Sequence, residues 1–272
     1  MKKLKLALFV AFLGALTFTG CKDDNDDKVT VMKKDIILSA ENAIPSYGGS
    51  ETGTITMELF EDNTMDFTIM VSGLASSDDL TAAHIHSGDV VSTGDVVLVL
   101  VDGTDITFSG NTGSATITLT DAQVVALEGS DLYVNVHSVE APGGLVRGQV
   151  DKTIDHAFNI ALSPANEVPA IMDRNEDGNA YLRVVGSTLY YKVQVNNLSG
   201  SDAIAGGHIH EGTASENGGV FLDLDIADGT QVDVTKMVQL GSTEMTTLSN
   251  DALYVNIHSV EMPGGLMRGQ IR

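Results

Sequence analysis

The sequence predicts an all-β protein made of two tandem copies of one Greek-key β-sandwich domain. Three observations support this prediction: an internal repeat, short apolar or alternating stretches separated by turn residues, and the composition. The 272 residues include 28 glycines and no Trp, which suits short strands joined by tight turns better than helical bundles. A chain of this length corresponds to about two domains.

The repeat is long and keeps its order. Four blocks of the first half return in the second half, the first two after 124 residues and the last two after 121: Leu38–Pro45, Ala83–Gly88, Leu132–Glu140 and Pro142–Val150. Solenoid repeats have periods of about 20–50 residues, so this one indicates a duplicated domain. We place the copies at 35–151 and 155–272, with a short link around 151–155 and no further domain after the second copy.

Alternation and turn residues predict the strands of each copy. In the first copy a hairpin is expected around Glu61–Asn63, and one helical turn begins at Thr120, where Gln123 completes a capping box and Gly129 closes the helix. The expected strands are Thr54–Leu59, Asp66–Val71, Val96–Val101, Ser114–Leu119, Leu132–His137 and Val146–Val150. Short strands at such spacing indicate a Greek-key sandwich or a flattened barrel.

The N-terminus is interpreted as an export signal. Residues 1–20 combine three early lysines with the short apolar stretch Leu6–Leu16, as in a secretory signal peptide. Phe18–Cys21 resembles a bacterial lipobox, in which Cys21 becomes the lipidated first residue. An ordinary signal peptide followed by an unrelated cysteine is the alternative. Residues 21–34 are rich in Asp and are expected to form a solvated tether.

This N-terminus predicts an outer-membrane lipoprotein that meets the membrane through its lipid anchor. The acidic residues after Cys21 resemble the export signal of surface-exposed lipoproteins, which leaves open which face of the membrane carries the protein. The formal net charge of −22 argues against nucleic acid as a partner, because both would be anionic. An envelope or extracellular protein is expected as partner, of unknown identity.

Three blocks of each copy resemble one known family. They are His-Ile-His-x-Gly, Leu-Tyr-Val-Asn-Val/Ile-His-Ser and Pro-Gly-Gly-x-x-Arg-Gly-Gln, and they occur in this order in both copies. Together they are similar to the CHRD (chordin-type) domain. The resemblance implies an immunoglobulin-like or related β-sandwich and implies little about activity.

Six of the seven histidines fall into two equivalent sets. His84 and His86 are two residues apart in an expected strand, so their side chains share a face. His137 lies opposite the apolar face of its own strand and is expected to point the same way. The second set is His208, His210 and His258. Three imidazoles on one face suit copper or zinc. Hydrogen bonds to turn carbonyls are the alternative, while His156, in the link, is expected at the surface.

The order of these residues also resembles the copper site of copper/zinc superoxide dismutase, which would make the sandwich similar to that family. The resemblance implies copper ligation by the six histidines and anion guidance by Arg147 and Arg268. It is incomplete, because no bridging histidine, zinc cluster or cysteine pair is found. The alternative for Arg147 is a structural pairing with a carboxylate such as Glu140.

Residues 173–178, Asp-Arg-Asn-Glu-Asp-Gly, match the first half of a calcium-binding loop, but Val184 occupies the position of the bidentate Glu. An acidic hairpin turn is therefore favoured over a calcium site. The sequence favours a non-catalytic binding or interaction module of the cell envelope. The alternative is a copper- or zinc-binding protein with one three-histidine site per domain, with or without dismutase chemistry.

Overall fold

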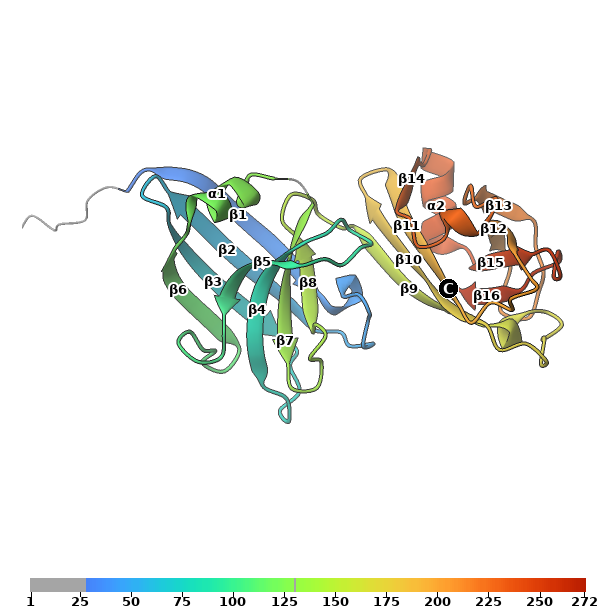
Figure 1. Cartoon of the computed structure of the whole chain (residues 1–272), viewed down its shortest axis with the longest axis horizontal. Helices are drawn as coiled ribbons and strands as arrows, with labels where there is room; N and C mark the ends of the chain where they lie inside the picture. The colour runs from blue at the N-terminus through green and yellow to red at the C-terminus, as the bar shows by residue number, and fades with distance from the viewer. Residues whose placement is uncertain (1–27, 130) are drawn as a thin grey trace, which may run out of the picture.

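The computed structural model describes residues 28–129 and 131–272. The predicted signal peptide, residues 1–20, and the predicted lipidation site, Cys21, lie outside this part. In Figure 1 the first domain runs from blue to green, and the second, from yellow to red, lies beside it. No helix of the described part is long and apolar enough to cross a membrane.

The first domain consists of eight strands, one α-helix and one short 3-10 helix. The strands alternate buried and exposed residues, so each presents one apolar face to the core. Their bounds are β1 Thr30–Ser39, β2 Thr52–Phe60, β3 Thr64–Ser72, β4 Leu80–Ser87, β5 Val96–Val101, β6 Thr112–Thr118, β7 Leu132–Ser138 and β8 Val146–Gln149; the helices are η1 Ala40–Asn42 and α1 Asp121–Leu127.

The second domain repeats this order of elements and has one additional 3-10 helix between its fifth and sixth strands. Its strands are β9 His156–Leu162, β10 Asp177–Val185, β11 Thr188–Asn196, β12 Ile204–Glu211, β13 Val220–Asp223, β14 Lys236–Gln239, β15 Leu253–Ser259 and β16 Met267–Gln270. Its helices are η2 Pro164–Asn166, η3 Gly229–Gln231 and α2 Ser242–Asn250. The prediction of an all-β protein with two sandwich-like domains is confirmed.

Each domain is made of two four-stranded antiparallel halves that meet at one edge. In the second domain they are separate sheets, with strand orders β14-β11-β10-β9 and β13-β12-β15-β16. In the first domain the equivalent halves form one eight-stranded sheet, joined where Ser39 pairs with Arg147. A single bridge between Ser163 and Arg268 marks the same place in the second domain. The connections cross repeatedly between the halves.

The predicted local structure is accurate in most of the first domain. The Val96–Val101 strand is found with the predicted bounds, and the hairpin joins β2 to β3. Helix α1 begins after Thr120 with the predicted capping box, and its C-cap is Glu128. Each domain encloses its own apolar core, with residues such as Leu38 and Ile85 in the first and Ile209 and Val255 in the second.

Two boundaries differ from the expectation. Strand β1 begins at Thr30, within the segment assigned to the tether, because residues 30–34 pair with the end of β2. His156 is not in the link but begins β9, where it pairs with Val184 and stays exposed.

The two domains contact each other through unlike surfaces. From the β4–β5 loop of the first domain, Val90 and Val91 are 1% exposed and pack on Tyr181 of β10. Asn159 of β9 donates to the Glu41 carbonyl at 2.7 Å, and Arg183 of β10 lies 3.5 Å from the Asn42 carbonyl. A loop and helix η1 of one domain therefore rest on the outer face of the other domain's sheet.

Candidate metal centre

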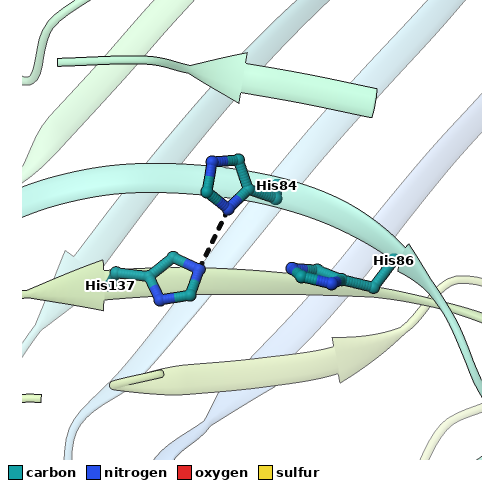
Figure 2. A group of neighbouring side chains, drawn as sticks. All are labelled: His84, His86 and His137. Atoms are coloured by element: carbon teal, nitrogen blue, oxygen red, sulfur yellow. Dashed lines mark hydrogen bonds between the residues drawn. The ribbon is translucent and has the colours of Figure 1, made fainter. Parts of the chain in front are cut away.

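Strands β4 and β7 bring three histidines together on the outer face of the first domain. They are antiparallel neighbours, and the alternation of each strand turns His84, His86 and His137 away from the apolar core. Figure 2 shows the three rings facing one another. One ligand nitrogen from each ring can be chosen so that all three lie within 4.8 Å of one another.

The hydrogen bonds of the rings decide which nitrogens face the centre. His86 Nδ1 donates to the Gly94 carbonyl at 3.0 Å, and His137 Nδ1 donates to the Pro142 carbonyl at 2.9 Å. In both rings the proton is thereby placed on Nδ1, which leaves Nε2 with a free lone pair. His86 Nε2 is buried and has no hydrogen-bond partner among the described residues.

His84 completes the group through its other nitrogen. Its Nδ1 lies 3.1 Å from His137 Nε2, the contact drawn as a dashed line in Figure 2. Because the His137 nitrogen carries no proton, His84 must hold its own proton on Nδ1 to make this bond. A cation between the rings would bind the lone pairs of His84 Nδ1 and His137 Nε2. For this, the proton of His84 must move from Nδ1 to Nε2.

The second domain contains the same centre. His208 Nδ1 lies 3.0 Å from His258 Nε2, while His210 donates to the Gly218 carbonyl and His258 to the Pro263 carbonyl, each at 3.1 Å. His210 Nε2 is again buried, with no partner in the described part of the chain. Both predicted histidine sets are therefore brought together, whereas His156 is far along the chain on β9 and joins neither cluster.

A model of the CHRD domain matches residues 35–150 and 158–271. The chain belongs to the CHRD-domain family. It carries two tandem CHRD domains, and each contains one of the histidine centres. No curated protein and no solved structure matches the chain.

The loop that follows β7 in each CHRD domain is shaped to hold its histidine. In the first domain, a Cβ at Gly144 would lie 2.4 Å from the side-chain oxygen of Asn135, and the residue has φ +138°, so only glycine fits. This close approach lets the Gly143 carbonyl accept from Asn135 at 3.2 Å. The adjacent Pro142 carbonyl is thereby positioned to orient His137.

Tyr133 and Arg147 form a stack beside the first centre. The His86 ring is parallel to the Tyr133 ring, with centroids 5.0 Å apart, and the Arg147 guanidinium carbon lies 3.6 Å from the same Tyr133 ring. Since β7 lies between β4 and β8, His86 and Arg147 approach this ring from opposite sides. His210, Tyr254 and Arg268 repeat the stack.

Arg147 is paired with loop carbonyls and not with the carboxylate that was considered as its structural partner. It is 1% exposed, its Nη2 donates to the carbonyls of Asp89 and Ser92, and the described residues hold no ion pair between it and Glu140. Burial lowers its pKa to about 10. Arg268 likewise donates to the Thr213 and Glu216 carbonyls. Arg147 therefore holds the β4–β5 loop and Arg268 the equivalent β12–β13 loop, and each guanidinium lies against the tyrosine ring of its stack.

In the candidate calcium loop, the carboxylate of Glu176 pairs with the guanidinium of Arg174. Arg174 forms ion pairs with Glu176 at 2.7 Å, with Asp202 at 2.6 Å and with Glu261 at 2.7 Å. Residues 173–176 lie in the long connection between the antiparallel strands β9 and β10. Sequence reasoning missed this network because Asp202 and Glu261 are distant in sequence from Arg174.

Burial shifts four of the six histidines, His84, His137, His210 and His258, towards the form that binds metal. It lowers the pKa of His84 and His137, with a further lowering of His84 by the neighbouring imidazoles and a partial offset for His137 by the Pro142 carbonyl. The pKa values of His210 and His258 are lowered by burial as well. The neutral imidazole, which is the ligand form, is therefore favoured at neutral pH.

These shifts predict that the metal-free protein loses stability in mild acid. A histidine whose folded pKa lies below its unfolded value of 6.5 stabilises the fold above that pH, and this contribution is lost as the pH falls through the folded pKa. Thermal unfolding of the metal-free chain should show a falling melting temperature below about pH 6.5. A variant with His84→Gln and His137→Gln should lose part of this dependence; an unchanged slope contradicts the prediction.

Proposed function

We propose that this tandem CHRD-domain protein binds one transition-metal ion in each domain, with copper or zinc as the ion. The observation that carries the proposal is the pair of equivalent centres, in which Nε2 of His86 and of His210 is buried with no partner among residues 28–129 and 131–272. Three nitrogens about 2.0–2.1 Å from one ion lie roughly 3–4 Å apart. Small rotations of the rings would bring the three nitrogens from their observed separations to these distances.

The surroundings of the rings support binding. Metal-bound histidines usually donate their second N–H to a carbonyl or carboxylate, and two rings of each centre already do so. Imidazole ligands suit copper and zinc, and among divalent ions copper binds such sites most tightly. Among the described residues no additional His, Cys or acidic cluster lies beside either centre, so we propose a binding module and do not assign dismutase activity.

The cell location is part of the proposal. The signal peptide, lipobox-like Cys21 and acidic residues 21–34 support a lipoprotein of the outer membrane, held by its lipid anchor. In that place the module would hold its ions outside the cytoplasm and could meet envelope or extracellular proteins. Globomycin-sensitive processing, or labelling with an alkyne fatty acid that is lost in Cys21→Ala, tests the anchor.

Metal stoichiometry tests the central claim. The chain from Lys22 onward should retain about two equivalents of Cu(II) or Zn(II) after dialysis, because each three-histidine centre holds one ion. His84→Ala combined with His86→Ala should leave one equivalent, and His208→Ala with His210→Ala should do the same. The matched control is His156→Ala, which should retain two. No retained metal in the unmodified chain overturns the proposal.

A further inference from the structure

The groove of the first domain that receives the second domain has an open counterpart in the second domain. In the first domain it is bordered by helix η1, Gln149 and the loop with Val90, in which the Asp89 carbonyl accepts from Arg147. Repeat alignment places η2, Ala214, Arg268 and Gln270 at the same positions. These residues line a cavity of about 280 Å³.

The first domain shows what such a groove accepts. Strand β10 crosses it, with Tyr181 packed on the valine loop and Arg183 completely buried near helix η1. Arg183 donates to Asn159, which itself donates to the Glu41 carbonyl. A space of only about 80 Å³ remains beside helix η1, bordered by Gln149, the link and the start of β9. A strand carrying arginine therefore fills the groove of the first domain.

The open groove is better suited to a cation than the filled one. Glu167 replaces Ala43 there, is 7% exposed, and its Oε1 is buried with no hydrogen-bond partner among the residues that the structure describes. It makes no ion pair with the nearby Arg268, whose Nη groups are held by Asn217 and by the Thr213 and Glu216 carbonyls. Burial raises the pKa of Glu167 to about 7, an effect that Arg268 only partly offsets.

We propose that this groove of the second domain is a docking site for an extended segment of a partner protein that inserts an arginine side chain beside Glu167. The guanidinium would meet the buried carboxylate and the main chain of η2, where Arg183 meets η1 in the first domain. The net charge of −22 favours the approach of a basic segment.

A second copy of this chain does not fit as the occupant. Its own Tyr181 and Arg183 are already buried between its domains. The equivalent positions on strand β2 of the first domain are Thr56 and Glu58, and a carboxylate would be repelled by Glu167.

The test uses the full chain from Lys22 onward and a capped peptide with the sequence of residues 179–185, Asn-Ala-Tyr-Leu-Arg-Val-Val. In NMR titrations the peptide should shift the amide signals of Glu167, Ala214 and Gln270 in a saturable way. A matched peptide with neutral citrulline in place of arginine should bind about tenfold more weakly, because it lacks the charge-assisted pair.

The variants separate docking from general adhesion. Glu167→Gln removes the charge at constant size, and Glu167→Ala installs the residue that the first domain carries at this position, so both should fold. Each should reduce binding of the arginine peptide to the level of the citrulline peptide. Equal binding of the two peptides, shifts confined to other surfaces, or no shift at all overturns the proposal.

Discussion

Replacing Arg174 with methionine should destabilise the second domain by roughly 3–5 kcal/mol. Arg174 pairs with three carboxylates, and the side chains of Glu176 and Asp202 are 2% and 0% exposed. Removing the cation leaves two buried acids without a counter-charge, which costs far more than losing a surface pair. Chemical denaturation followed by NMR signals of the second domain measures the change.

A surface pair provides the control for this substitution. Lys33 and Glu58 also form an ion pair, but their side chains are 56% and 30% exposed. Lys33→Met should therefore change the free energy of unfolding by less than about 1 kcal/mol. If Arg174→Met has an effect as small as that of Lys33→Met, the network is not a main stabiliser of the second domain.

The same network predicts an acid transition. Burial alone raises the pKa of Asp202, but hydrogen bonds from the Glu261 amide, Ser259 and Arg174 outweigh it and lower the pKa to about 2. The folded pKa is below the unfolded value of 3.8, so the stabilisation is present above that pH and is lost as the pH falls towards 2. In Arg174→Met the loss between pH 4 and pH 2, about the range of the shift, should be smaller.

Placing aspartates at Val90 and Val91 should separate the two domains. Both side chains are 1% exposed and pack on Tyr181, and a buried carboxylate without a partner costs several kcal/mol, about 3 or more for each. The domain contact would open before either core unfolds, because these valines lie outside both cores. NMR relaxation should show the domains changing from joint to independent tumbling.

The second domain again supplies a matched control. Ala214 and Ser215 occupy the equivalent loop positions and are exposed. Aspartates there should leave tumbling unchanged and each domain folded. Joint tumbling of the Val90→Asp/Val91→Asp protein would show that the Arg183 and Asn159 contacts suffice to hold the domains together.

Residue patterns predicted the parts of this protein that depend on local periodicity. The repeat gives the two domains, and alternation gives the Val96–Val101 strand and the common face of His84 and His86. Placing His137 on that face needed only the apolar residues of its own strand. The family resemblance is confirmed by the match to both copies.

Other features depend on contacts between distant segments. Arg147 holds a loop by donating to a carbonyl more than 50 residues away in the sequence. No local sequence pattern distinguishes an arginine with this role from one that binds an anion. The domain contact could have been suspected from the repeat, because Tyr181 and Arg183 replace Thr56 and Glu58 between otherwise similar strands. That difference was visible in the sequence, but it gave no indication of which surface the two residues contact.

The contact between the domains joins two different surfaces of one repeated unit, and such heterologous contacts generate closed rings or open filaments, depending on the rotation between units. Identical units joined in this way would continue into a ring or a helical filament. Here growth through this contact is blocked at the first domain, because its β2 face carries Thr56 and Glu58 where the second domain carries Tyr181 and Arg183. We infer that divergence of the two copies removes from the first domain the side chains through which a further copy would be added.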